Sequence, residues 1–167
     1  MAFDRTRSLR GALAGTVAAA VWYAQQPLDK RVFGVAYDDA ELLASLARQP
    51  HGVGVLLHLS NGALFGAAYA AAAPSVPLHP VLRGPLAGLA EHLATWPGTA
   101  VVAPRLWGSG RAFAQATWRH LLFGLVLGEL ERRLNPPAAD LEPVDEAAIA
   151  SNGHGSAAHL VASGPAR

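Results

Sequence analysis

RGALAG at residues 10–15 recurs as RGPLAG at residues 83–88, and HLSNGALFG at residues 58–66 recurs as HLLFGLVLG at residues 120–128. The two phrases keep the same order in both halves of the chain, which indicates an internal duplication of a helical hairpin. Each of the four phrases carries two glycines four residues apart in an apolar setting, and membrane helices pack closely through such pairs. The repeat therefore predicts an all-α fold, a four-helix transmembrane bundle made of two duplicated hairpins. The helix-packing glycines are Gly11, Gly15, Gly62, Gly66, Gly84, Gly88, Gly124 and Gly128.

Four apolar windows are nearly long enough to cross the hydrocarbon core of a bilayer, which takes about 20 helical residues. They cover about residues 9–26, 52–73, 81–103 and 112–130, and they define a transmembrane domain over residues 1–134. The third window contains Trp96-Pro97-Gly98, where the proline should kink or end the helix. Between the first two windows, Asp38 and Asp39 precede an apolar run that ends at Ala47, which predicts a short capped helix at the membrane surface.

The two ends of the chain differ from the windows. Arg5, Arg7 and Arg10 before a short alanine-rich run also fit a cleaved signal peptide. The return of the first phrase in the second half argues against that alternative, because a discarded segment has no reason to match a retained one. Residues 135–167 lose the helical periodicity and are rich in Ala, Gly, Ser and Pro, so we predict a disordered tail there.

Composition excludes several classes of function. Of the 167 residues, 51% are hydrophobic and 15% charged, and the formal net charge is +1, so nucleic acid is not an expected partner. The chain has no cysteine, which rules out disulfides, thiolate metal sites and a cysteine nucleophile. No phosphate loop, dinucleotide fingerprint or H-E-x-x-H motif occurs, and we assign no catalytic residue. The expected partners are the lipid bilayer and either a second copy or another membrane protein.

Basic and aromatic residues set the expected orientation. With the N-terminus in the cytoplasm, the inner segments carry six arginines and the outer loops carry Lys30 and four arginines. The three arginines before the first window favour both termini in the cytoplasm, at a plasma membrane that we take to be a bacterial inner membrane. Five aromatic residues are expected in a belt at the outer interface, namely Trp22, Tyr23, Trp96, Trp107 and Trp118.

Several polar side chains fall inside the windows. His58 and His120 stand four and eight residues before the glycines of their phrases, so helical spacing puts each histidine on its glycine face. Ionisable groups at such depth are rare and usually face protein or water. Among these residues, Glu91 is the strongest indication of such a buried polar site. Its expected partners are His92, His120, Arg119 and Gln115. The predicted intramembrane polar cluster is Glu91, His92, His120, His58, Arg119, Gln115 and Asn61.

Three interpretations of this cluster stay open. It could be a hydrogen-bond and ion-pair network that holds the hairpins in register. It could be a small transporter or proton-conducting path that uses Glu91 and His120. It could bind haem or a metal ion through His58, His92 and His120, although histidines on separate helices form no ligand motif and no cofactor is predicted. The leading function is a non-enzymatic structural or partner-binding component of a membrane.

The phrases WRHLLFG at residues 118–124 and GELERRL at residues 128–134 resemble those of small bacterial four-span integral membrane proteins. The resemblance extends over about residues 8–134. It implies a multi-pass membrane fold and carries no activity and no functional residue.

Overall fold

The computed structural model describes residues 4–136, and every regular element among them is helical. The all-α prediction is confirmed. Almost all of the predicted tail, from residue 137 onward, lies outside the described residues. The elements are α1 (Arg5–Phe33), α2 (Asp39–Ala47), α3 (His51–Ala72), η1 (Ala73–Ser75), α4 (Pro80–Thr95), η2 (Trp96–Gly98), α5 (Thr99–Val102) and α6 (Gly110–Leu134).

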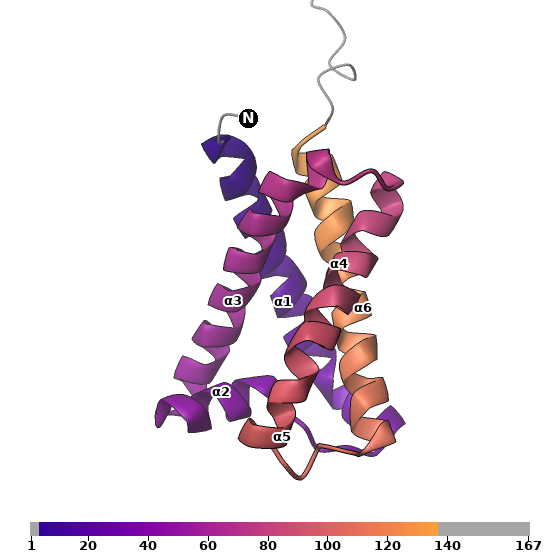
Figure 1. Ribbon diagram of the computed structural model, residues 1–167. Helices are drawn as coiled ribbons and strands as arrows, with labels where there is room; N and C mark the ends of the chain where they lie inside the picture. The colour runs from indigo at the N-terminus through magenta and orange to yellow at the C-terminus, as the bar shows by residue number, and fades with distance from the viewer. Residues whose placement is uncertain (1–3, 137–167) are drawn as a thin grey trace, which may run out of the picture. The chain divides into compact units, whose positions relative to one another are not determined.

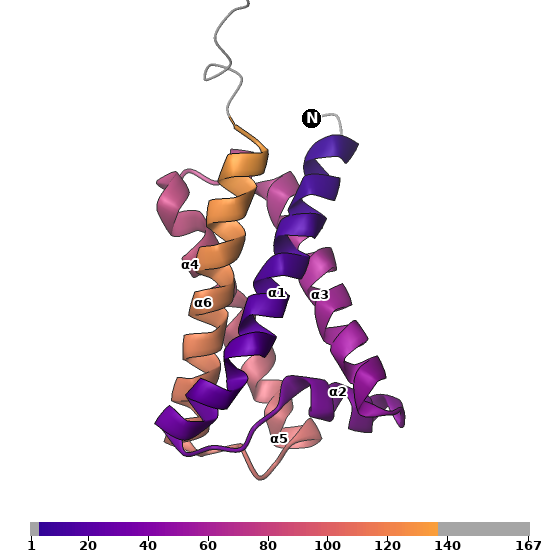
Figure 2. The ribbon, with the colours of Figure 1, turned by 180° about the vertical axis from the view of Figure 1, so that it is seen from behind.

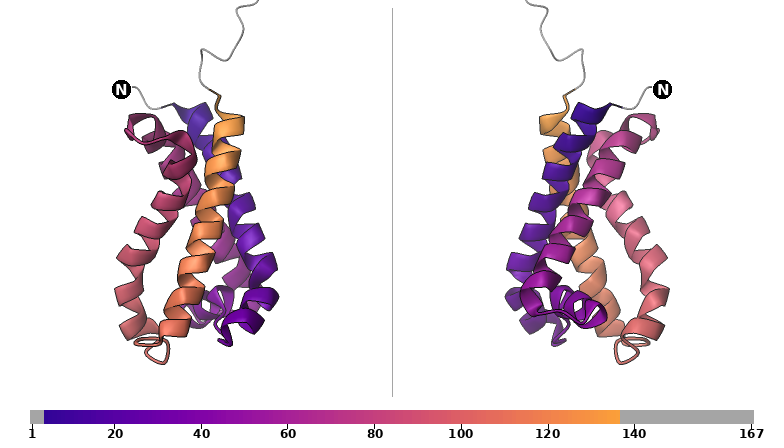
Figure 3. Two further views of the ribbon diagram at one scale, coloured as in Figure 1. Left: turned by 90° about the vertical axis from the view of Figure 1, so that its right-hand side faces the viewer. Right: turned by 90° about the vertical axis from the view of Figure 1, so that its left-hand side faces the viewer.

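The four long helices pair as two hairpins joined along one seam. α1 packs on α3, α4 packs on α6, and the hairpins meet where α1 packs on α6. α3 and α4 lie toward the viewer in Figure 1, whereas α1 and α6 are side by side in front in Figure 2. Within residues 4–136, α3 and α4 do not form a packed pair. The side views place α2 and α5 at the end of the bundle away from the N-terminus (Figure 3).

Glycines bring the two helices of each hairpin together. A Cβ atom added to Gly15 would overlap the carbonyl of Gly62, and one added to Gly84 would overlap the carbonyl of Gly124. Each repeated phrase therefore contributes one side of a backbone-to-backbone contact, which is how helices pack closely without large side chains. The registers differ. Gly15 meets Gly62, whereas the equivalent Gly88 meets the carbonyl of His120, four residues or about one helical turn away from the matching position.

Two helix ends differ from the predicted windows. α1 does not end at Gln26 but continues through Pro27 to Phe33, and Gly34 caps it in the left-handed conformation (φ 67°). It continues because Asp29 is buried against α6, so tertiary pairing outweighs the hydrogen bond that proline removes. α4 ends at Thr95, before the Trp-Pro-Gly break, and the remainder of the third window is η2 and the short α5.

α2 is the short helix that the acidic pair predicts. The side chain of Asp38 caps it by accepting a hydrogen bond from the backbone N–H of Glu41 (3.1 Å). Its buried residues, Ala40 and Ala44, lie against α3, where Gly54 has no side chain to hold them off. α2 thus lies against the first turns of α3, beside the loop that carries Tyr37.

Alanines and glycines make up much of the core together with a few large apolar side chains, while many other large apolar side chains face outward. The main cluster centres on Ala14, Ala18, Trp22, Phe123 and Leu127. One helical segment in the described part, His51–Ser75, is long and apolar enough to cross a membrane by length and composition (25 residues, mean hydropathy 1.3). α4 is shorter than a span, and the other two long helices carry charged or amide side chains. That any of the four long helices crosses a membrane therefore stays a prediction.

Candidate functional site

Arg119 is the centre of a buried ion-pair network at the end of the bundle that carries α2. Its guanidinium holds Asp29 with two hydrogen bonds, from Nε to Oδ2 (2.6 Å) and from Nη2 to Oδ1 (2.8 Å). Nη1 donates to Oδ2 of Asp39 (2.8 Å), and Nη2 also donates to the carbonyl of Tyr37 (3.0 Å). The side chains of Arg119 and Asp29 are both 0% exposed. The network therefore joins α6 to α1 and to the start of α2.

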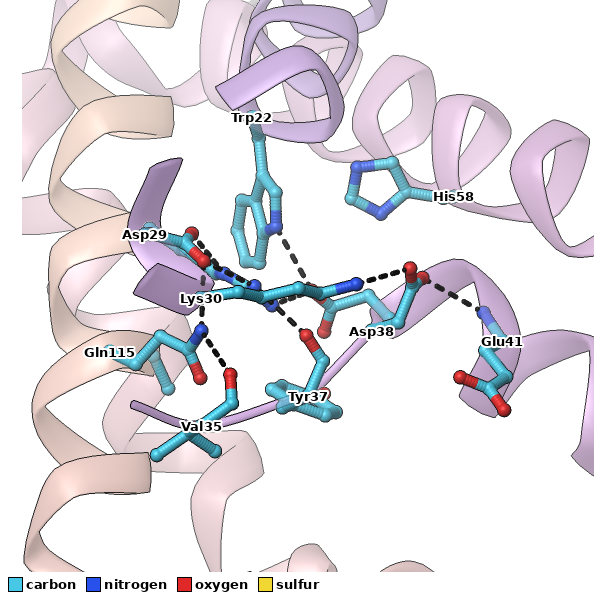
Figure 4. Close-up of polar contacts among 12 residues, drawn as sticks. Trp22, Asp29, Lys30, Val35, Tyr37, Asp38, Glu41, His58 and Gln115 are labelled. Carbon is cyan, nitrogen blue, oxygen red and sulfur yellow. Dashed lines mark hydrogen bonds and ion pairs between the residues drawn. The ribbon is translucent and has the colours of Figure 1, made fainter. Parts of the chain in front are cut away.

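Neutral groups complete the network around Asp29. Gln115 donates from Nε2 to Oδ1 of Asp29 (2.8 Å) and to the carbonyl of Val35 (3.1 Å), as Figure 4 shows. Gln25 donates to Oδ2 of Asp29 (2.6 Å). With these bonds and those from Arg119, Asp29 accepts four, which satisfies a carboxylate that no water reaches.

Asp39 and Asp38 follow one another but have different partners. Asp39 accepts from the indole Nε1 of Trp22 (3.0 Å) as well as from Arg119. Asp38 pairs with Lys30 (2.8 Å). Burial acts to raise the pKa of Asp38, but the Lys30 ammonium and the Glu41 N–H outweigh it and hold that pKa below its usual value. Burial and the nearby Asp39 carboxylate raise the pKa of the Tyr37 phenol, which stays protonated at neutral pH.

Above this network a cavity of about 190 Å³ lies between the hairpins. α1 and α6 form its back, α3 and α4 its two sides, and α2 its base. Its polar lining is Glu91, His58, His120, Asn61, Asp39, Tyr37 and Thr95, and its apolar lining includes Trp22, Phe65 and Phe123. Residues of both α3 and α4 line the cavity, although the two helices do not pack on each other within residues 4–136.

The three histidines near the cavity each have a defined hydrogen bond. Nε2 of His58 donates to the carbonyl of Ala19 (3.1 Å), and Nδ1 of His120 donates to that of Ala116 (2.8 Å), since a carbonyl can only accept. The ring of His92 is 4.9 Å from that of His120, and its Nε2 bonds the Thr117 hydroxyl (3.0 Å). These bonds orient the rings and leave one nitrogen of His58 and His120 for another partner.

The predicted polar cluster divides into two groups. Glu91, His58, His120 and Asn61 share the cavity, and His92 lies behind it, buried among aromatic rings. Arg119 and Gln115 do not pair with Glu91. Both turn to Asp29 instead, because α1 extends far enough to bring that carboxylate to them.

Sequence reasoning missed Asp29 and Asp39 and misplaced Trp22. Trp22 is buried at 6% exposure, with its ring 4.6 Å from that of His120, whereas Trp107 and Trp118 are the exposed aromatics that a belt requires. A signal for Asp29 was present. Trp22, Gln26 and Asp29 repeat at spacings of four and three, which continues the buried face of α1 past Pro27.

A second ionic contact ties the opposite end of the seam. Arg7 pairs with Glu131 of α6, and its Nε donates to the carbonyl of Ala70 in α3 (2.8 Å). Asn135 donates to the same Glu131 carboxylate (3.3 Å). The bundle is thus held at both ends by charged groups that link helices far apart in the chain.

The structure gives no support to a metal centre. Within residues 4–136, no three His, Asp or Glu side chains are grouped closely enough to hold a metal ion. His58 and His120 both contact Trp22, with ring centroids 5.4 and 4.6 Å from that of the indole.

No protein family model, no curated protein and no solved structure matches this chain. The resemblance to small bacterial four-span membrane proteins therefore stays a prediction.

Proposed function

We propose that the chain is a multi-pass membrane protein whose four long helices cross the bilayer. The observation that carries the proposal is the inverted distribution of side chains. Buried positions hold mostly alanines, glycines and a charged network with few large apolar side chains, while many large apolar side chains lie on the outside of all four helices. A water-exposed bundle would leave this surface unsatisfied, whereas lipid covers it without cost. The outward residues include Leu9, Leu13, Val17, Val21, Leu56, Leu64, Val81, Leu82, Leu86, Leu93, Phe113 and Leu125.

Helix lengths support the same arrangement. α1, α3 and α6 have 29, 22 and 25 residues. At about 1.5 Å per residue they exceed the hydrocarbon thickness of about 30 Å. α4 has 16 residues, about 24 Å, and η2 with α5 extends the same segment to Val102. The charged ends of α1 and α6 then lie in the headgroup region.

The orientation that we propose places the termini of the bundle in the cytoplasm, at a plasma membrane of bacterial inner-membrane type. The bundle end with Arg5, Arg7 and Arg10 also carries Arg132 and Arg133, which follows the positive-inside rule. The opposite end carries Lys30 and four arginines, so the preference rests on the three arginines that precede the first apolar window.

Within that membrane we infer a non-enzymatic, ligand-binding or partner-binding role at the cavity between α3 and α4. Two features of the described residues support it. Glu91 and the ring of His120 face one cavity, and the two helices at its sides, α3 and α4, do not pack on each other. The buried Arg119 network lies beneath the cavity and holds its base in place. A purely structural polar cluster would be satisfied internally, whereas no hydrogen bond or ion pair to the Glu91 carboxylate occurs among residues 4–136.

Cysteine scanning tests both parts, because the native chain has no cysteine. In intact cells, Leu13→Cys, Leu64→Cys and Leu125→Cys should stay unlabelled by a membrane-impermeant maleimide, and Glu41→Cys should be labelled from outside. Labelling of the three leucine positions at the rate of Glu41→Cys would overturn the four-span proposal.

Two positions on α3 test whether the cavity is open to water. Asn61 lines the cavity, whereas the side chain of Leu64 points outward and is 71% exposed on the surface that we assign to lipid. With protein in nanodiscs, a small water-soluble thiosulfonate should modify Asn61→Cys at least tenfold faster than Leu64→Cys. Equal rates would overturn the binding role assigned to the cavity.

A second candidate function is a path for protons or small solutes. It is favoured because Glu91 and His120 line the same space. Proteoliposomes should then show a proton or solute flux that Glu91→Gln abolishes, and flux that survives this substitution contradicts the path.

A further inference from the structure

We propose that the cavity between α3 and α4 binds an amphipathic organic cation, with its ammonium group at Glu91 and its apolar part along the gap between the two helices. The proposal rests on the binding role inferred above and adds the chemical class of the ligand. It is carried by the charge of the cavity, by its aromatic walls and by an apolar extension.

The charge of the cavity favours a cation. Among the described residues, no lysine or arginine side chain lines it, whereas the carboxylates of Glu91 and Asp39 do. The base beneath it holds two carboxylates, Asp29 and Asp39, against the single guanidinium of Arg119. That network therefore carries an excess of one negative charge, and Glu91 adds to it. In a low-dielectric site, such an excess attracts a positive ligand and repels an anion.

The aromatic walls favour a cation that is weakly hydrated. Trp22, Phe65 and Phe123 line the cavity, and the rings of Phe65 and Phe123 pack edge to face with centroids 5.6 Å apart. Ring faces attract a desolvated ammonium group, and quaternary ammonium ligands are recognised in this way. The indole N–H of Trp22 is already bonded to Asp39, so this ring offers its π surface.

An apolar extension sets the direction of the ligand. A second cavity of about 420 Å³ shares Phe65 with the first and continues along α3 and α4 past Tyr69 and Leu86. Its charged lining residue is Arg83, whose Nε donates to the carbonyl of Leu78 (2.9 Å) at the end of the bundle that carries the termini. A cation is repelled from that end, so the ammonium group lies at Glu91 and the hydrocarbon part points toward Arg83.

The test uses the full chain in nanodiscs of zwitterionic phosphatidylcholine, with two ligands that share one tail. Octyltrimethylammonium should bind in isothermal titration, whereas octylsulfonate should bind at least tenfold more weakly. Glu91→Gln should weaken binding of the cation at least tenfold. Glu129→Gln is the matched control, because that acid is exposed and paired with Arg132 and Arg133 at the other end of α6, and it should leave binding unchanged.

Phe65→Leu provides a second variant that keeps the acid and removes one ring. It should weaken binding of the cation about threefold while leaving the circular dichroism spectrum unchanged. Equal binding of cation and anion, or binding that Glu91→Gln does not alter, overturns the proposal. If Asn61→Cys is modified rapidly but the cation does not bind, the cation proposal fails and the open cavity stands; if neither is seen, both fail.

Discussion

Removing the Arg119 side chain should leave the buried carboxylate of Asp29 without a counter-charge. The substitution Arg119→Met keeps much of the volume of the side chain and deletes its four hydrogen bonds, two to Asp29, one to Asp39 and one to the carbonyl of Tyr37. Asp29 then remains as an unpaired carboxylate that is 0% exposed. Breaking a buried pair in this way costs about 3–5 kcal/mol.

The partner substitution should cost less, because the network has an excess of carboxylates. After Asp29→Asn, Arg119 keeps its ion pair with Asp39 (2.8 Å). The net charge of residues 29, 39 and 119 together then changes from about −1 to zero. We expect a loss of about 1.5–3 kcal/mol, the range for hydrogen bonds to a charged group. Adding Asp29→Asn to Arg119→Met removes the stranded carboxylate, so the double variant should regain at least about 1 kcal/mol over Arg119→Met alone.

Unfolding by sodium dodecyl sulfate in mixed micelles, followed by circular dichroism, measures these free energies. Arg133→Met is the control, because its side chain is 69% exposed and its pair with Glu129 lies at the surface, where an ion pair contributes little to stability. The reasoning is refuted if Asp29→Asn is as costly as Arg119→Met, or if the double variant is less stable than Arg119→Met alone.

Three further changes test the packing and the polar contacts. Gly62→Ala places a methyl group against the carbonyl of Gly15 and should cost about 1–3 kcal/mol in the same unfolding assay, whereas Gly52→Ala, which meets nothing within 4 Å, should not destabilise the bundle. The ion pair with Lys30 lowers the pKa of Asp38 in the folded protein. The stability that this pair contributes is therefore present above the unfolded pKa of about 3.9 and is lost as the pH falls through the folded pKa. Lys30→Met should raise the folded pKa of Asp38 in a carboxyl NMR titration and flatten the loss of stability below about pH 4. Trp22→Phe removes the indole donor to a carboxylate and should cost about 1.5–3 kcal/mol, and a wild-type unfolding midpoint would contradict this.

The pairing of the helices could be predicted from the sequence, because glycines four residues apart form a local pattern that favours close helix packing. Gly15 and Gly62 come from different phrases of the repeat, and the structure brings them into backbone contact; Gly84 and Gly124 do the same in the second copy. The shift of one helical turn between the registers of the two hairpins could not be predicted from the sequence. It depends on which carbonyl each glycine meets, and that choice is made by tertiary packing.

The partners of the polar residues could be predicted less well than their burial. The predicted polar cluster includes Arg119 and Gln115, and both are buried, but no local pattern shows that they meet Asp29, which is 90 residues from Arg119. The predicted first window ends at Gln26, just before Pro27, because proline removes a helical hydrogen bond, and Asp29 therefore falls outside it. Both acids before α2 fit a helix start by sequence, whereas in the structure Asp38 alone caps α2 and Asp39 turns inward.

The Arg119–Asp29 pair also has a consequence for biosynthesis. Asp29 belongs to the first of the four long helices and Arg119 to the last. The first hairpin can close on its own glycines, but the Asp29 carboxylate has no guanidinium beside it until α6 is made. In a chain truncated before α6 this acid would stay without its counter-charge, so the first hairpin depends on the last helix to neutralise it.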